Sequence, residues 1–197
     1  MPMLIYKRSH ASSTEFFDFW RRVYGDDKKE RLYSDNIRHE LTEQRILDLF
    51  EWKNGSRLSK RKGASVRRNF VERRRELDQL QPDQKVEDLL AHFPEGGVIF
   101  RIFWLHCWRP DRFPIYDQHV HRAMAFILNG QQEEIPAADA PKIASYIQRY
   151  MPFHATFDSI DIPSVDRALD RTVDKALWAF GKFLADNPNF PTAAVVS

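Results

Sequence analysis

The first residue in this sequence that could take part in a reaction is an aspartate at the start of an apolar helical run. Asp117 follows the extended entry that Pro114 imposes, within the run FPIYDQHVHRAMAFIL at residues 113–128. Its carboxylate can cap the helix by accepting the unsatisfied first-turn amides, an interaction worth about 1 kcal/mol. A carboxylate can also stabilise developing positive charge or activate water. The residues around Asp117 leave both roles open.

A second candidate is a tight turn 23 residues before the aspartate. The stretch FPEGG, from Phe93 to Gly97, has the composition of a turn, and the apolar run VIFRIFWLHCW follows it. Length favours a helix for that run, and because it is apolar nearly all round the helix should be central. Backbone amides of a glycine-rich turn at a helix N-terminus can bind a phosphate group.

A strongly basic stretch precedes the turn. Residues 57–75, here called the basic segment, contain nine Lys or Arg and one acid, Glu72. Such a stretch can be a solvated helix face, but ordinary exposed helices mix both charge signs, so the imbalance favours contact with phosphates. The cations we expect to hold a nucleic-acid backbone are Lys60, Arg61, Lys62, Arg67 and Arg68.

These segments together resemble the helix-hairpin-helix DNA glycosylase superfamily. Its members carry a Leu-Pro-Gly-Val-Gly hairpin, then a buried helix, then a segment like Val-Asp-x-His-Val-x-Arg; FPEGG and YDQHVHRA occupy those places here. The resemblance covers residues 93–123. It implies that Asp117 is the catalytic carboxylate, that His119 belongs to the nucleic-acid-binding motif, and that Gly96 and Gly97 contact phosphate.

The resemblance implies hydrolysis of an N-glycosidic bond after the base is flipped out of the stack. Ile99 falls where base-excising enzymes that also cut the backbone have a lysine, so no Schiff-base step is expected from that position. In the resembled fold the loop after the early helix approaches the gap left by the flipped base, which places Lys53 and Asn54 there. Lys53 is either a displaced nucleophile or a solvated surface lysine. Glu95 replaces a hairpin glycine and would repel phosphate.

Other chemistries find little support in the residue spacing. His106 and Cys107 are adjacent and His119 and His121 are two apart, so neither pair has the i,i+4 spacing of helical metal ligands. We predict no metal site and no cofactor, since no P-loop or dinucleotide fingerprint is present. Trp104 and Trp108 could line a base pocket but are expected in the core.

Composition is that of a folded, mildly basic protein. The chain has 197 residues, a formal net charge of +2 and 13% aromatic residues. Its longest apolar run has 11 residues, against about 20 for a membrane span, so no membrane contact is expected. The N-terminus lacks a secretion-signal pattern, which favours a cytoplasmic location, or association with the nucleoid in a prokaryote.

The apolar periodicity predicts an all-α protein of about eight helices. The resemblance implies that these helices form a multi-helix orthogonal bundle like the helix-hairpin-helix DNA glycosylase fold. We expect residues 1–186 to form one helical domain, undivided or in two lobes with the basic segment in one, and residues 187–197 to form a flexible tail. A strand is considered only at residues 3–6. The expected helix boundaries are Ser12 to Gly25, Thr42 to Gly55, Ser65 to Leu80, Asp83 to His92, residues 98–108, Asp117 to Gly130, residues 137–150 and residues 164–185.

The sequence therefore predicts a duplex-DNA-binding N-glycosylase that lacks the lyase lysine and removes a damaged or modified base. Two alternatives remain open. The chain could be a non-catalytic nucleic-acid-binding module on the same fold, which Glu95 and Ile99 favour. It could also be a helical protein–protein adaptor in which Asp117 is only a cap. Oligomeric state is not predicted.

Overall fold

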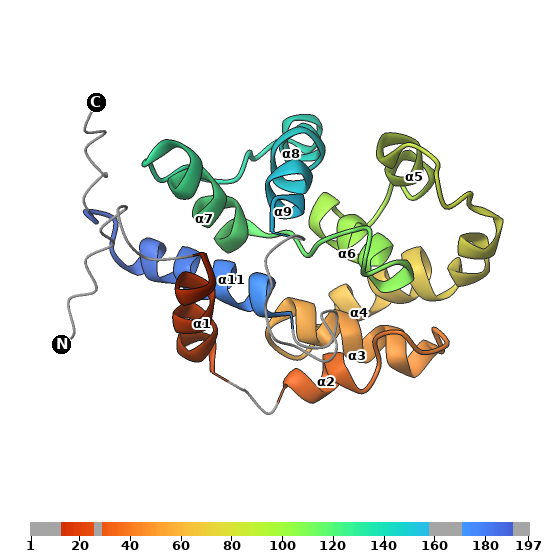
Figure 1. Cartoon of the computed structure of the whole chain (residues 1–197). Helices are drawn as coiled ribbons and strands as arrows, with labels where there is room; N and C mark the ends of the chain where they lie inside the picture. Colours follow the sequence, from red (N-terminus) through yellow and green to blue (C-terminus); the bar gives the residue numbers. More distant parts are fainter. Residues whose placement is uncertain (1–12, 26–28, 158–170, 191–197) are drawn as a thin grey trace. The chain divides into compact units, whose positions relative to one another are not determined.

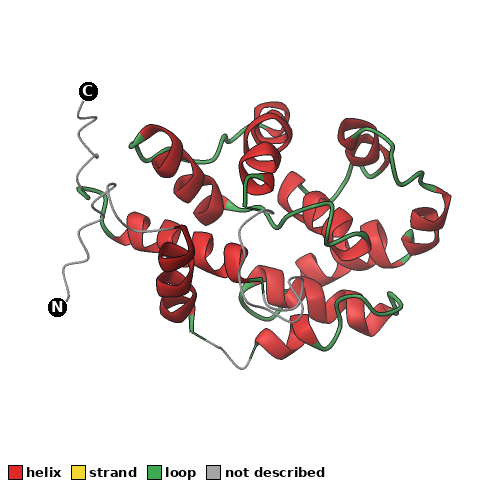
Figure 2. Ribbon diagram, viewed as in Figure 1, coloured by secondary structure: helices red, strands yellow, loops and turns green. Residues whose placement is uncertain are grey.

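The computed structural model describes residues 13–25, 29–157 and 171–190, which form helices joined by loops and contain no strand (Figures 1 and 2). The all-α prediction is thus confirmed. The chain divides into two compact units. Unit 1 comprises Met1–Gly25, Asp117–Ile135 and Pro152–Ser197, and unit 2 comprises Asp26–Tyr116 and Pro136–Met151. No helix among the described residues is both long and apolar enough to cross a membrane.

Unit 1 is built around one long helix. In Figure 1, α11 (Thr172–Asp186) runs beside both α1 (Ser13–Tyr24) and α7 (Gln118–Asn129), and it packs against each of them. Aromatic rings fill the α1–α11 contact: the ring of Phe180 lies 5.3 Å from that of Phe16 and 5.0 Å from that of Trp20. The short helix α9 (Met151–Ala155) begins at the last residue of unit 2 and continues in unit 1.

Unit 2 holds the larger number of described helices. Its elements are α2 (Glu30–Ser34), α3 (Glu43–Asn54), α4 (Lys60–Val66), a π-helix η1 (Arg67–Val71), a 3₁₀ helix η2 (Arg74–Gln79), α5 (Val86–His92), α6 (Val98–Trp108), α8 (Asp139–Ser145) and a π-helix η3 (Tyr146–Tyr150).

Helix α6 is the core of unit 2, as its apolar sequence predicts. Ile102, Phe103, Trp104 and Leu105 are each at most 1% exposed, so every face of the helix is covered. Trp104 is therefore a core residue, and Trp108 at the end of the helix is half-buried. The guanidinium of Arg101 is also buried and donates a hydrogen bond to the carbonyl of Leu90 in α5.

Most predicted helix boundaries are confirmed. The hydroxyl oxygen of Thr42 accepts a hydrogen bond from the Arg45 amide at 3.4 Å, and α3 ends at Gly55 with a φ of +70°. Helix α7 likewise ends at Gly130, also at +70°, and α1 ends before Gly25 at +69°. Predictions for Ser12, for residues 3–6 and 164–170, and for most of the tail fall outside the described residues.

The predicted helix from Ser65 to Leu80 is wrong. Ser59 caps the helix instead, its oxygen accepting from the Lys62 amide at 3.3 Å. Ser65 lies inside α4, and its hydroxyl accepts a hydrogen bond from Asn69 at 3.1 Å. The chain then passes through η1 and η2 rather than one continuous α-helix. The helices expected at 83–92 and 137–150 begin later, at Val86 and Asp139.

Candidate nucleic-acid interface

The glycine-rich turn joins α5 to α6 as a tight hairpin between two helices. Gly96 and Gly97 both have left-handed backbones, with φ of +98° and +80°. Gly97 and Glu95 are exposed, whereas Phe93 is buried with its ring 6.2 Å from that of Trp104. The first amides of α6 have no partner within their own helix, so the turn presents hydrogen-bond donors where a phosphate could bind.

The turn sits directly on the basic segment. A Cβ atom built on Gly96 would lie 2.7 Å from Cζ of Phe70 and 3.5 Å from the amide nitrogen of Asn69, both in η1. No side chain fits at Gly96, because the contact is too close and its φ is left-handed. This contact brings the hairpin and the residues next to Arg67 and Arg68 together within unit 2. Nothing in the sequence indicated it.

A second interaction ties the turn to the basic segment. The guanidinium of Arg73 donates to both carboxylate oxygens of Glu76, at 2.8 and 2.7 Å, and to the carbonyl of His92 at 2.8 Å. It also lies 4.9 Å from the centroid of the Phe93 ring. The hydrogen bond from Arg73 lowers the pKa of Glu76 from its ordinary value. Arg73 thus anchors the start of the turn, a role that sequence reasoning missed.

The predicted DNA-contacting cations are all exposed. The side chains of Lys60 and Arg61 make no hydrogen bond or ion pair with any described residue. The remaining three have local partners: Lys62 donates to Asn54 at 2.6 Å, Arg67 to Glu43 at 3.0 Å, and Arg68 to Asn69 at 3.4 Å. Exposed pairs of this kind are worth little, so these cations remain available to a polyanion.

Lys53 and Asn54 lie at the C-terminal end of α3, in the same unit. The ammonium of Lys53 is 6.0 Å from the ring centroid of Phe103, and its side chain is half-buried. The amide of Asn54 donates to the carbonyl of Ser56 at 2.9 Å. Asn54 therefore shapes the loop after α3, and it also holds Lys62.

Asp117 is the N-cap of α7. One carboxylate oxygen accepts hydrogen bonds from the amides of His119 at 2.9 Å and Val120 at 3.2 Å. The side chain is half-buried, at the positive end of a 12-residue helix. Both the capping bonds and the helix dipole favour a negative charge there. Capping is compatible with a catalytic role, because the bonds also orient the carboxylate.

The residues after Asp117 pack inward. His119 is half-buried, with its ring 4.9 Å from that of Trp178, and burial lowers its pKa. The guanidinium of Arg122 is buried and donates to the carbonyl of Gly181 at 3.2 Å and to Glu134 at 2.7 Å. Arg122, which matches the last residue of the predicted motif, thus joins α7 to α11.

The candidate residues fall into two groups. Asp117 and His119 belong to unit 1; the hairpin glycines, Lys53, Asn54 and the exposed cations belong to unit 2. Among the residues that the structure describes, no three His, Cys, Asp or Glu side chains form a cluster that could hold a metal ion. Comparison of the chain with protein-family models, with curated proteins and with solved structures finds no match. Membership of the helix-hairpin-helix glycosylase superfamily stays a prediction.

Proposed function

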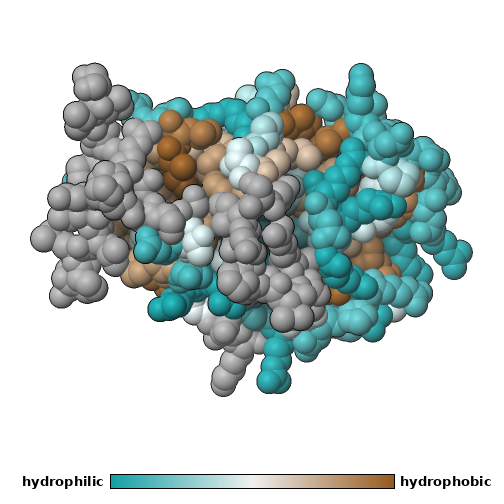
Figure 3. All heavy atoms as spheres, in the orientation of Figure 1, coloured by the Kyte–Doolittle hydropathy of each residue, from teal (hydrophilic) through white to brown (hydrophobic). Residues whose placement is uncertain are grey.

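We propose that the protein binds duplex DNA through the hairpin turn and the basic segment. The observation that carries the proposal is the close contact of Gly96 with Phe70 and Asn69, because it brings the glycine-rich turn next to the cations of the basic segment. Backbone amides of the turn would bind one phosphate, and Arg67 and Arg68 would neutralise its neighbours. Figure 3 shows hydrophilic side chains over most of the right of the view, where α5 of unit 2 lies in Figure 1.

We further propose that Asp117 is the carboxylate of a hydrolytic N-glycosylase. Departure of a base leaves positive charge on the sugar, which a fixed carboxylate stabilises, and the same group can activate the attacking water. The two capping bonds hold its oxygens in one orientation. The Ile99 side chain cannot form a Schiff base, so the reaction would end with base release and an intact backbone.

A non-catalytic nucleic-acid-binding protein is the second candidate. This candidate is favoured because contacts within the protein already give each of the motif residues a structural role. Asp117 caps α7, His119 packs against Trp178, and Arg122 bonds to α11 and Glu134.

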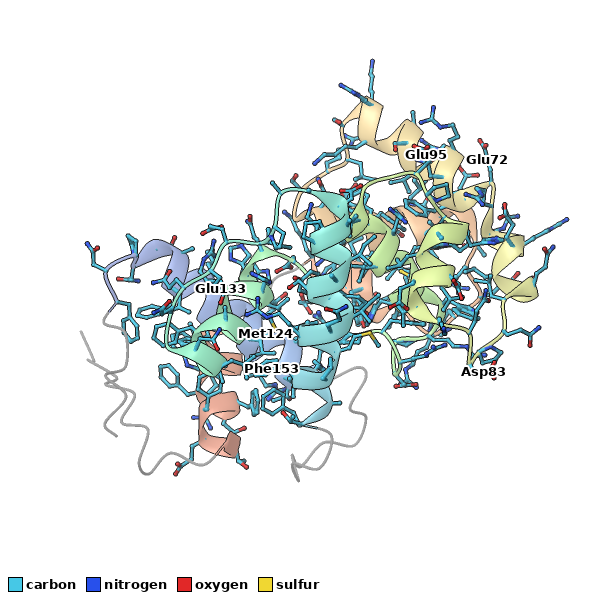
Figure 4. All side chains as sticks on the ribbon, turned by 90° about the horizontal axis from the view of Figure 1, so that it is seen from above. Glu72, Asp83, Glu95, Met124, Glu133 and Phe153 are labelled. Atoms are coloured by element: carbon cyan, nitrogen blue, oxygen red, sulfur yellow. The ribbon has the colours of Figure 1, made fainter. Side chains whose placement is uncertain are left out.

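The charge of Glu95 provides the test of the DNA-binding surface. Glu95 is exposed in the turn, where its carboxylate would repel a phosphate, so Glu95→Gln should bind duplex DNA more tightly, by roughly two- to fivefold. Asp83→Asn is the matched control: Asp83 is also exposed and, in Figure 4, lies on the opposite side of unit 2 from Glu95. Fluorescence anisotropy with a labelled duplex measures both. Equal effects of the two substitutions, or no DNA binding at all, would refute the proposed surface and favour an adaptor.

Base release provides the test of catalysis. Wild type and Asp117→Asn are incubated with duplexes carrying deaminated, alkylated and oxidised bases, and abasic sites are cleaved with alkali for detection. The amide can still accept the capping hydrogen bonds, so helix α7 should persist while release falls by at least about a hundredfold. Release by Asp117→Asn at the wild-type rate would rule out this carboxylate. No release from any duplex by wild type, with binding retained, would favour the non-catalytic protein.

A further inference from the structure

A cavity in unit 2 lies apart from the hairpin turn. Its volume is about 680 Å³, within the range of sites that bind small molecules. Its walls come from the loop before α3, from η2 and the residues after it, and from the end of α6 with the following loop. The lining includes the five arginines Arg38, Arg74, Arg75, Arg109 and Arg112.

Arginine dominates this lining. Five arginines face three carboxylates, those of Glu40, Asp78 and Asp111, which leaves a formal excess of two positive charges. Few of the lining residues are large and apolar. A cavity of this composition suits a small anion better than an apolar ligand, because guanidinium groups pair with anionic oxygens.

Three of the five arginines build the walls. Arg38 forms an ion pair with Asp111 and so links the loop before α3 to the loop after α6. Arg112 donates to the carbonyls of Pro82 and Gln84, and Arg74 donates to the carbonyl of Val71 at 3.0 Å. The bonds of Arg38 and Arg112 connect the loop before α3, the residues after η2 and the loop after α6, which together enclose the cavity.

The other two arginines remain available. The side chains of Arg75 and Arg109 make no hydrogen bond or ion pair with any residue in the described part of the chain. The guanidinium of Arg109 lies 4.9 Å from the ring centroid of Trp108, which positions it without using its donors. The N–H groups of these two guanidinium groups can donate hydrogen bonds to the oxygens of a phosphate group.

The backbone at the cavity edge supports a binding role. Arg38 has a φ of +62°, and Arg38 and Arg171 are the non-glycine residues of the described chain with a positive φ. Such a conformation is unfavourable for arginine and persists only where surrounding structure enforces it. The side chain of this residue forms the ion pair with Asp111.

We propose that this cavity binds a phosphorylated small molecule of nucleotide size, with Arg75 and Arg109 contacting the phosphate oxygens. The site includes Arg74 and Arg75 from the end of the basic segment, but it involves neither the hairpin turn nor base excision. A free nucleotide and a DNA backbone carry the same group, so the experiment must separate the two sources.

Isothermal titration calorimetry with ADP and with pyrophosphate, at physiological ionic strength, tests the proposal. Wild type should bind saturably, and Arg75→Gln/Arg109→Gln should bind at least about tenfold more weakly, since charged hydrogen bonds are lost. Lys60→Gln/Arg61→Gln is the matched control, because it removes two exposed cations that do not line the cavity. Circular dichroism and thermal unfolding verify that both double variants fold.

Three results would overturn the proposal. The first is that neither probe gives a saturable heat with wild type. The second is an equal loss of affinity in both double variants, which would indicate general charge attraction. The third is weaker binding of duplex DNA by Arg75→Gln/Arg109→Gln when ADP and pyrophosphate fail to bind wild type, which would assign these arginines to the nucleic acid.

Discussion

At the scale of single residues, Gly181 decides how closely α7 and α11 approach. A Cβ atom at this position would lie 1.8 Å from the carbonyl oxygen of His119, and backbone cannot swing aside as a side chain can. We expect Gly181→Ala to lower the free energy of unfolding by about 3 kcal/mol, because the two helices must separate. Urea denaturation followed by circular dichroism measures the change.

Gly63→Ala is the control for this prediction. Gly63 lies inside α4, and the nearest atom to its added Cβ, the end of the Arg67 side chain, is 3.8 Å away. The substitution should stabilise the protein by up to about 1 kcal/mol through helix propensity. If Gly181→Ala behaved like Gly63→Ala, the close packing of α7 on α11 would be wrong.

His119 makes stability depend on pH in a defined direction. Burial lowers its pKa, and Arg122 and Lys182 lower it further, while Asp117 opposes them. The unfolded chain therefore binds a proton at higher pH than the folded one. The stability from neutral His119 is complete above its ordinary pKa of 6.5 and is lost as the pH falls through the folded value.

We accordingly expect the difference in unfolding free energy between wild type and His119→Gln to shrink as the pH falls from 7.5 to about 5. Urea denaturation at several pH values measures it, and comparison with the variant cancels the other histidines. A difference that grows as the pH falls would mean that the folded protein favours the charged imidazole.

At the scale of elements, the join between α7 and α11 depends on the buried Arg122. Arg122→Met keeps the aliphatic volume but removes hydrogen bonds to Gly181 and Glu134, so we expect a loss of about 2 kcal/mol. Glu134→Gln should cost less than about 1 kcal/mol, since Glu134 is 76% exposed. Thermal unfolding of both variants checks the order. The reverse order would place the stabilisation in the ion pair rather than in the helix contact.

The sequence predicted those elements whose signals are local. The apolar run of α6, the cap Thr42 and the stop at Gly130 all act within a few residues, and each was confirmed. The prediction for the segment from Ser59 to Leu80 was wrong for two reasons. Several serines could cap a helix there, and the choice between Ser59 and Ser65 depends on competing side-chain hydrogen bonds. A π-helix also adds residues to a turn, which apolar periodicity does not reveal.

In the candidate site, too, the sequence predicted only the features that depend on neighbouring residues. The turn and the capping aspartate could be predicted because glycine and aspartate act on their own backbone. The contact of Gly96 with Phe70 could not, since it joins residues 26 positions apart by shape alone. The arginines of the cavity were also missed, because Arg38, Arg75 and Arg109 come together only in the folded unit.

At the scale of the whole molecule, the two units interleave in sequence and differ in charge. The chain passes between them four times, so local patterns could not define either unit. Unit 2 contains 21 Lys or Arg against 17 Asp or Glu, whereas unit 1 contains 9 against 11. Attraction to a polyanion should therefore arise in unit 2, although the candidate carboxylate Asp117 belongs to unit 1.

This difference predicts where the salt dependence of DNA binding originates. Each phosphate contact contributes about 0.9 to the slope of log affinity against log salt, so Arg67→Gln/Arg68→Gln should reduce the slope by roughly 2. Arg22→Gln/Lys182→Gln removes the same charge from exposed positions of unit 1 and should leave the slope unchanged. Anisotropy titrations at several salt concentrations measure both. Because the two variants have equal net charge, an equal reduction would mean that total charge, rather than the surface beside the hairpin, drives binding.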